Sequence, residues 1–177
     1  MNKFEKVSFS EYYNSTKYSA LYPIMDADIP LLENIMVEYK EIKLPKRSTA
    51  KSAGYDFYAP VAFTLEPGNS IKIATGIKAQ IDDNAFLALF PRSSLGFKYR
   101  LRLDNTVGII DSDYYNNGNN EGHIFIKITN EGTTPLTVNA EDAFAQGIFI
   151  PFLKTVDDDT TEERVGGIGS TDPQIKK

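Results

Sequence analysis

Residues 105–114 (NTVGIIDSDY) bring together residue types that could do chemistry on a small molecule. The β-branched neighbours of Gly108 favour an extended backbone. Because glycine has no Cβ, a flat ring could approach the main chain there. Asp111 follows at the expected strand end, and Tyr114 lies in a turn-forming context from which it could fold back over the same spot. The pattern predicts a pocket for a small planar molecule with an acid or base at its rim.

A simpler structural interpretation of the same residues is also open. Gly108 could lie at a β-bulge, Asp111 could begin a turn, and Tyr114 could pack in the core of a hairpin. Short isolated motifs occur often by chance. These residues alone therefore do not decide between a pocket and a hairpin.

Four other segments carry residues that suit a phosphorylated ligand. They are residues 52–56 (SAGYD), 91–96 (PRSSLG), 145–147 (AQG) and 164–171 (RVGGIGST). The second of them follows an apolar run and offers a guanidinium, two hydroxyls and backbone N–H groups to phosphate oxygens. Each also has an ordinary explanation: a surface ion pair for Arg92, a strand-edge amide for Gln146 and a flexible end for the tail.

Composition limits the classes of protein that need to be considered. The 177 residues suggest one domain with a sizeable core, without cysteine and with a single histidine, His123. Thiolate chemistry and multi-histidine metal sites are thereby excluded, and a Ser-His-Asp triad is disfavoured. The net charge of −5 argues against nucleic-acid binding. We expect a cytoplasmic protein without a membrane span or an export signal.

Period-two hydrophobic patterns predict many short strands separated by turns. They involve Val37–Glu41, Ile71–Ile73, Ile77–Ile81, Ala85–Phe90, Ile124–Ile128 and Phe144–Phe152. Strands of this kind, without a clear helical period, predict an all-β barrel or jelly roll. Three parts are expected: an N-terminal extension over 1–35, a β-barrel over 36–155, and a linker with a glycine-rich arm over 156–177. The extension is expected to be partly helical from Asp28, with Pro30 at the first helical position, and could bind a protein partner.

The five segments, in this order and at these separations, resemble the five motifs of the trimeric dUTP pyrophosphatases, the dUTPases. The resemblance covers roughly residues 37–172. It implies a jelly-roll enzyme that hydrolyses dUTP to dUMP and pyrophosphate with Mg²⁺. It also implies a homotrimer in which three subunits contribute to each active site.

The resemblance further implies a role for each matched residue. Asp111 corresponds to the carboxylate that deprotonates the attacking water, assisted by Gln146 near the α-phosphate and by Asp56 as a supporting carboxylate. The phosphates are expected to bind Arg92, Ser93 and Ser94. The main chain around Asn105, Gly108 and Ile110 is expected to pair with uracil, and Tyr114 to pack on the deoxyribose. The arm that closes over the triphosphate corresponds to Arg164, Gly167, Ile168, Gly169, Ser170 and Thr171.

Mg²⁺ held by substrate phosphates and waters would need no dedicated ligand cluster in the chain, and none is visible in the sequence. Three features depart from the family pattern. The arm has Ile168 where a phenylalanine is usual and Asp172 where a glycine is usual, and residues 115–121 form a longer loop. Two other functions remain open: a nucleotide-binding regulator on a dUTPase scaffold, and a relative of the dCTP deaminases, which share the fold and a similar Arg-Ser-Ser segment.

Overall fold

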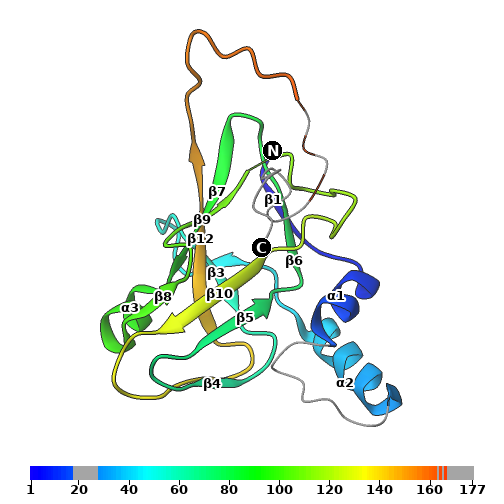
Figure 1. Cartoon of the computed structure of the whole chain (residues 1–177), viewed down its shortest axis with the longest axis vertical. Coiled ribbons are helices and arrows are strands. Elements are labelled where there is room, and N and C mark those ends of the chain that lie inside the picture. The colour runs from blue at the N-terminus through cyan, green and yellow to red at the C-terminus, as the bar shows by residue number, and fades with distance from the viewer. Residues whose placement is uncertain (18–27, 163, 165, 167–177) are drawn as a thin grey trace, which may run out of the picture.

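Antiparallel strands form most of the regular structure in the computed structural model, which describes residues 1–17, 28–162, 164 and 166 (Figure 1). The strands are β1 (Lys3–Lys6), β2 (Lys46–Arg47), β3 (Tyr55–Tyr58), β4 (Phe63–Leu65), β5 (Ser70–Ala74), β6 (Ile77–Gln80), β7 (Ala85–Pro91), β8 (Leu101–Leu103), β9 (Gly108–Ile110), β10 (Phe125–Asn130), β11 (Leu136–Val138) and β12 (Ala143–Pro151). The helices are α1 (Phe9–Thr16), α2 (Asp28–Glu41) and α3 (Ser93–Tyr99). The predicted all-β class is confirmed.

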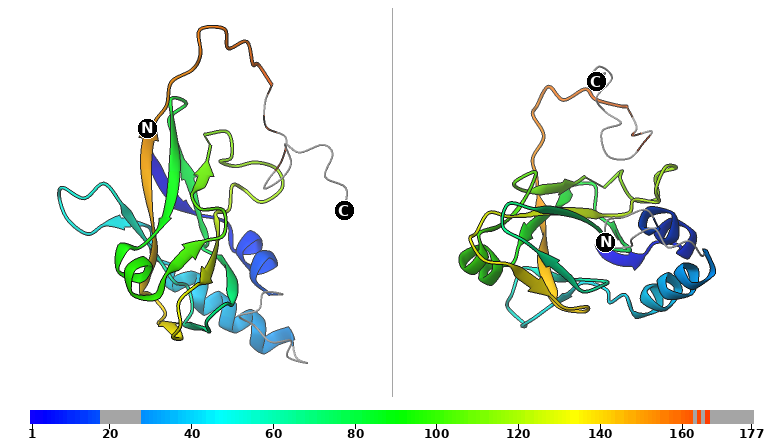
Figure 2. Two further views of the ribbon diagram at one scale, coloured as in Figure 1. Left: turned by 60° about the vertical axis from the view of Figure 1, so that its left-hand side comes forward. Right: turned by 60° about the horizontal axis from the view of Figure 1, so that its bottom comes forward.

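The largest sheet has the strand order β2-β3-β12-β7-β9, with β12 and β7 paired over seven residues. A second sheet has the order β5-β10-β8, and the pairs β1-β6 and β4-β11 complete the body. In both views of Figure 2, residues 152–162 leave β12 and arch away from the sheets. Among the helices of the described residues, none has the length and apolar character needed to cross a membrane.

The core lies between the sheets and follows the period-two patterns of the sequence. In β10, Ile126 and Ile128 are buried while Lys127 is exposed. In β7, the consecutive residues Leu87, Ala88 and Leu89 are all buried, as expected for a strand covered on both faces. The strands predicted over Ile71–Ile73, Ile77–Ile81, Ala85–Phe90, Ile124–Ile128 and Phe144–Phe152 each coincide with an observed strand to within a few residues.

The strand predicted over Val37–Glu41 is wrong, because these residues belong to α2. The helix begins at Asp28 as expected, with Pro30 inside its first turn. Its contact face is formed by Ile35 and Tyr39, followed by Ile42 just beyond its end, which is helical spacing. The alternation of apolar and charged residues from Val37 to Glu41 therefore concealed a helical pattern that starts before it.

The N-terminal residues are more closely integrated than an extension would be. β1 pairs with β6 over four residues, and Phe4, Val7 and Tyr12 are buried in the core. Tyr12 packs against Tyr39 of α2 with ring centroids 5.8 Å apart. The expected boundary between residues 35 and 36 lies inside α2, so residues 1–17 and α2 belong structurally with the β-body.

Candidate active site

β7 organises the predicted site residues, because it lies between the two strands that carry most of them. β9 pairs with one edge of β7 and leads directly into Asp111. β12 pairs with the other edge and carries Gln146. The chain after β7 supplies Arg92 and then forms α3, which was not expected as a helix. The sheet thus gathers residues that lie more than fifty positions apart in the sequence.

One cavity of about 460 Å³ lies beside β9, where the sequence predicted the base pocket. Its walls include Asn105 and Gly108 from the predicted motif, together with Leu89 and Phe125. Ile110 is only half-buried and packs against the core instead of lining this cavity. The cavity is therefore bordered by two motif residues and by apolar residues of β7, β8 and β10. The charged residues Lys72, Asp104 and Lys127 complete its lining.

The packing of β9 against β7 gives a structural reason for a glycine at position 108. A Cβ built at this position would lie 3.0 Å from both Cβ and Cδ1 of Leu89. A Cβ would therefore meet a side chain of the neighbouring strand β7. Gly108 therefore lets β9 lie close to β7.

Asp111 stands at the end of β9 with its side chain 57% exposed. Arg164 lies across this strand end, with Nη2 at 2.7 Å from Asp111 Oδ2 and Nε at 2.9 Å from Asp113 Oδ1. The same guanidinium lies over the Tyr114 ring, 5.9 Å from its centroid. Residues of two distant predicted motifs therefore meet here, the strand-end carboxylate and the first residue of the arm.

Tyr114 is almost completely buried, with 5% of its surface exposed. Its hydroxyl donates to the carbonyl of His123 over 2.9 Å and accepts from the Asn120 amide over 2.8 Å. Burial raises the pKa of this hydroxyl, so it stays protonated near neutral pH. One end of the ring is thus anchored, and Arg164 lies over one face.

A second cavity, of about 310 Å³, contains the predicted phosphate-binding residues. It is lined by Ser48, Ser52, Gly54, Asp56, Arg92, Ser93, Ser94 and Gln146. The structure therefore brings together three of the predicted segments around one hollow. A guanidinium, four hydroxyls and an amide are a donor set suited to phosphate oxygens.

Asp56 holds the cation of this cavity in place. Its Oδ1 lies 3.3 Å from Arg92 Nε, and its Oδ2 accepts a hydrogen bond of 2.6 Å from the Ser48 hydroxyl. The carboxylate is nearly buried, so its charge is compensated by these neighbours. Its position fits a supporting carboxylate that orients Arg92.

Gln146 lies at the back of the same cavity because of strand register. It is opposite Asp56 on β3 and opposite Phe90 on β7. Its Nε2 donates to the Pro91 carbonyl over 3.1 Å, and its Oε1 would lie only 2.4 Å from a Cβ on Gly54. Gly54 therefore leaves room for the glutamine amide.

Asp111 and Arg92 lie near opposite ends of β7 within one chain. Leu87 pairs with Ile110, so Asp111 follows on the side of Phe86, near the start of β7. Arg92 follows the other end of β7. With a rise of about 3.3 Å per residue, the stretch from Phe86 to Arg92 corresponds to about 20 Å. A single chain therefore does not place Asp111 and Arg92 on the same phosphorus atom.

Several functional positions lie beyond what the sequence reasoning identified. Ser48 contacts Asp56 and Asn120 contacts Tyr114, and no periodicity or motif distinguished these two from other polar loop residues. Asp113, which contacts Arg164, lies inside a predicted motif but had no role assigned to it. The remaining arm residues Gly167, Ile168, Gly169, Ser170 and Thr171 lie outside the described residues, as does Asp172.

Comparisons with known proteins agree with this arrangement. The dUTPase family model matches residues 40–172. A deoxyuridine 5'-triphosphate nucleotidohydrolase of Lactococcus lactis is 42% identical over 141 residues, covering 77% of this chain and 94% of that protein. One from Paraburkholderia phymatum is 38% identical over 155 residues, covering 83% and 98%.

Solved structures give the same result for the fold. The crystal structure of dUTPase from Streptococcus mutans is 44% identical and superimposes with a TM-score of 0.58, covering 63% of this chain and 88% of that one. The family model spans the strands that build both cavities, from β2 to β12. The chain belongs to the dUTPase family.

Proposed function

We propose that this protein hydrolyses dUTP to dUMP and pyrophosphate. The observation that carries the proposal is the pair of cavities, one beside the glycine strand that ends in Asp111 and one containing Arg92, Asp56 and Gln146. The first suits a flat base and the second suits phosphates. The identity of 42% to a deoxyuridine triphosphate nucleotidohydrolase over most of the chain supports the choice of substrate.

Asp111 would act as the general base toward the attacking water. Its carboxylate is exposed at a fixed strand end, so a water molecule can reach it. Hydrolysis of a phosphoanhydride requires a positioned water and compensation of developing negative charge, with no covalent intermediate. A positioned base typically contributes about 10²- to 10⁴-fold, and Arg92 with the surrounding hydroxyls would stabilise the charge.

The base and sugar would be recognised next to β9. Uracil would pair with the main chain near Asn105, in the cavity of about 460 Å³. Backbone pairing of this kind would exclude cytosine, whose exocyclic amine would face a donor. The Tyr114 ring would pack on the deoxyribose where a ribose would carry its 2′-hydroxyl, so specificity would come from a steric clash.

Mg²⁺ would be held mainly by the substrate. Mg²⁺ keeps several waters and usually binds one or two carboxylates together with phosphates. The described part of the chain contains no group of three or more acidic or histidine ligands, and the hydroxyl-rich cavity around Arg92 fits a metal that arrives on the triphosphate. Bound there, the ion would neutralise phosphate charge.

The active enzyme would be a homotrimer with composite sites. The separation of about 20 Å between Asp111 and Arg92, estimated from strand rise, is too large for both to contact one α-phosphate within a chain. A second copy would therefore supply the Arg92 cavity, and the arm from Arg164 to Thr171 would close over the triphosphate. The proposal places the enzyme in the cytoplasm, where nucleoside triphosphates are made and used.

Side-by-side assays of pyrophosphate release from dUTP, dCTP, UTP and dTTP test this function. We expect dUTP to exceed each of the others by about 10²-fold or more in kcat/KM, as for a site that hydrogen-bonds its substrate. Ammonia release from dCTP would instead indicate a deaminase. Tight dUTP binding without pyrophosphate release would indicate a regulator that binds nucleotide.

A further inference from the structure

The loop formed by residues 115–122 connects Tyr114 to β10, and one of its side chains reaches back to the tyrosine. We propose that Asn120 is a positioning residue that fixes the Tyr114 ring and thereby sets the preference for deoxyribose over ribose. This inference rests on the proposed function, since it concerns how the same site reads the sugar. Asn120 lines neither of the two cavities that hold the predicted site residues.

The Tyr114 hydroxyl has a partner on each side. It donates its single proton to the His123 carbonyl over 2.9 Å and accepts from Asn120 Nδ2 over 2.8 Å. Donor and acceptor roles are therefore both used, in a buried environment where an unmade hydrogen bond is costly. Two bonds from different directions restrict the tilt of the ring as well as its depth.

Asn120 is itself held in one orientation. Its Oδ1 accepts from Asn117 Nδ2 over 2.8 Å and from the Gly122 N–H over 3.2 Å. The carbonyl oxygen of the amide is thereby assigned, and the NH₂ group must point toward Tyr114. The side chain therefore acts as a fixed donor and not as a mobile surface amide.

The backbone of the loop is shaped to make this contact. Gly122 has φ of +79°, and a Cβ there would lie 2.6 Å from the Tyr114 carbonyl oxygen. The His123 N–H donates to the Asn120 carbonyl over 2.8 Å, which closes the turn. The loop therefore folds tightly onto the segment that contains Tyr114.

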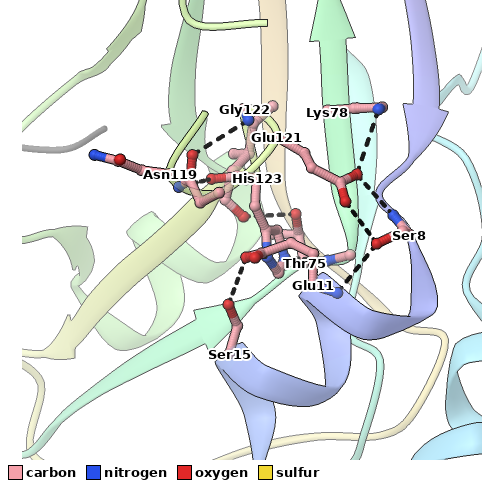
Figure 3. A network of polar contacts seen from close by, with 12 residues as sticks. Ser8, Glu11, Ser15, Thr75, Lys78, Asn119, Glu121, Gly122 and His123 are labelled. Atoms are coloured by element: carbon pink, nitrogen blue, oxygen red, sulfur yellow. Dashed lines mark hydrogen bonds and ion pairs between the residues drawn. The ribbon is translucent and has the colours of Figure 1, made fainter. Parts of the chain in front are cut away.

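The base of the loop is tied to the N-terminal segment (Figure 3). Glu121 accepts hydrogen bonds from the Ser8 N–H over 2.9 Å and from the Ser8 hydroxyl over 2.6 Å. The His123 ring is buried between the Gly76 N–H, at 2.8 Å from Nε2, and Glu11, at 3.0 Å from Nδ1. Contacts with the N-terminal segment and the core thus hold the loop in place, and the loop in turn holds the tyrosine hydroxyl.

A replacement that removes only the donor tests this role. Asn120→Asp keeps an oxygen for Asn117 and Gly122 but places a second acceptor at the tyrosine hydroxyl. With one proton for two acceptors, only one of the two contacts survives, and the ring is less restricted. We expect the ratio of kcat/KM for dUTP over UTP to fall about fivefold, the equivalent of one hydrogen bond.

Asn119→Asp is the matched control. Asn119 is exposed on the same loop, and its side chain makes no hydrogen bond with the described residues. The control carries the same change of charge a single position away. It should leave the dUTP/UTP ratio at the wild-type value, and Asn120→Ala, which lowers the ratio without adding charge, should agree with Asn120→Asp.

A double-mutant cycle separates positioning from general stability. In a Tyr114→Phe background the hydroxyl is absent, so Asn120→Asp should no longer change the dUTP/UTP ratio. A purely structural role would lower the melting temperature and the activity on both nucleotides together, in either background. An unchanged ratio in Asn120→Asp, with normal turnover of dUTP, would overturn the inference while leaving the proposed function intact.

Binding measurements provide a readout that does not depend on turnover. Calorimetric titration with dUMP and UMP should show the same loss of discrimination in Asn120→Asp. If the wild-type protein binds neither nucleotide and releases no pyrophosphate from dUTP, the proposed function and this inference both fail. If it discriminates between them and the variant discriminates equally well, only the role of Asn120 is refuted.

Discussion

At the residue scale, the carboxylates of Asp111 and Asp113 differ in predicted role although one guanidinium contacts both. Arg164 lies 2.7 Å from the first and 2.9 Å from the second. Both side chains are about half exposed, at 57% and 51%. Only Asp111 directly follows the β9 strand beside the base cavity. The pair therefore offers a general base and a matched control within three positions.

Asp111→Asn should nearly abolish turnover while dUTP binding survives. Asparagine keeps the shape of the side chain but cannot accept the proton of water, so kcat should fall by about 10²-fold or more. Asp113→Asn, which also loses a contact with Arg164, should have a much smaller effect. Steady-state kinetics and dUTP titration of both variants measure this, and turnover of Asp111→Asn within a few-fold of wild type would rule out its role as base.

His123 should make stability depend on pH. Burial lowers the pKa of His123, opposed by Glu11 and Glu121 and assisted by Lys72. Because the folded-state pKa lies below the unfolded value of about 6.5, the unfolded chain binds the proton more readily. The contribution of His123 to folding stability should therefore be fully present above about pH 6.5. It should decrease as pH falls, by at most ~1.4 kcal/mol per pH unit.

Glu38 acts in the opposite direction, since burial raises its pKa to about 7. The contribution of Glu38 to folding stability is largest at low pH and is lost as pH rises toward neutrality. Urea unfolding from pH 5 to 8 should therefore be measured in a Glu38→Gln background, with and without His123→Gln. Glutamine at position 123 can replace both hydrogen bonds of the imidazole without titrating. The free energy of unfolding of the His123→Gln protein should therefore depend less on pH. Equal slopes in the two proteins would contradict the prediction.

At the scale of elements, the pairing of β3 with β12 positions the phosphate cavity. Gln146 lies opposite Asp56, and its amide fills the space next to Gly54. The same register brings Ser48, at the end of β2, to the Asp56 carboxylate. Small substitutions on or just before β3 should therefore alter catalytic activity by moving Gln146 on β12.

Gly54→Ala should lower kcat without unfolding the protein. The added methyl group would lie 2.4 Å from Gln146 Oε1, too close for both to keep their places, so the amide must shift. We expect a loss of about tenfold, comparable with one hydrogen bond to the reacting groups. Gly118→Ala is the control, because a Cβ there meets nothing within 4 Å. Identical kinetics for the two variants would mean that Gln146 has no role in turnover.

At the scale of the whole molecule, the distribution of the site along β7 has a consequence for assembly. The cavity with Arg92 and the strand end with Asp111 lie near opposite ends of this strand. Within one chain, the Arg92 cavity lacks the predicted base, and the strand end with Asp111 lacks the predicted phosphate-binding residues. The composite site proposed above, formed between copies of the chain, would bring the two together without moving any strand.

Chains that are inactive separately should therefore complement each other. Co-expression of Asp111→Asn with Arg92→Ala under two affinity tags should give mixed trimers with about a third of the wild-type activity, because one of the three subunit junctions then pairs the two kinds of chain in the required order. Mixed trimers of confirmed mass without activity would show that one chain builds its own site. An active monomer would have the same meaning.

The sequence by itself determined the family, through its motifs, and most of the strands. Asp111, Arg92, Asp56 and Gln146 were identified from motif order, and all four lie in or beside a cavity or strand end as that order implied. Strand positions followed from side chains that alternate between core and solvent, a property that each short segment carries locally.

Tertiary structure alone decided how these local pieces meet. Residues 37–41 alternate like a strand, but packing of Ile35 and Tyr39 against α1 and the core makes them helical. The contact of Arg164 with Asp111, the support of Tyr114 by Asn120 and the separation of Asp111 from Arg92 all depend on register and loop closure between distant segments. Local periodicity reports which face of an element is buried, whereas pairing partners are selected by the packing of the whole chain.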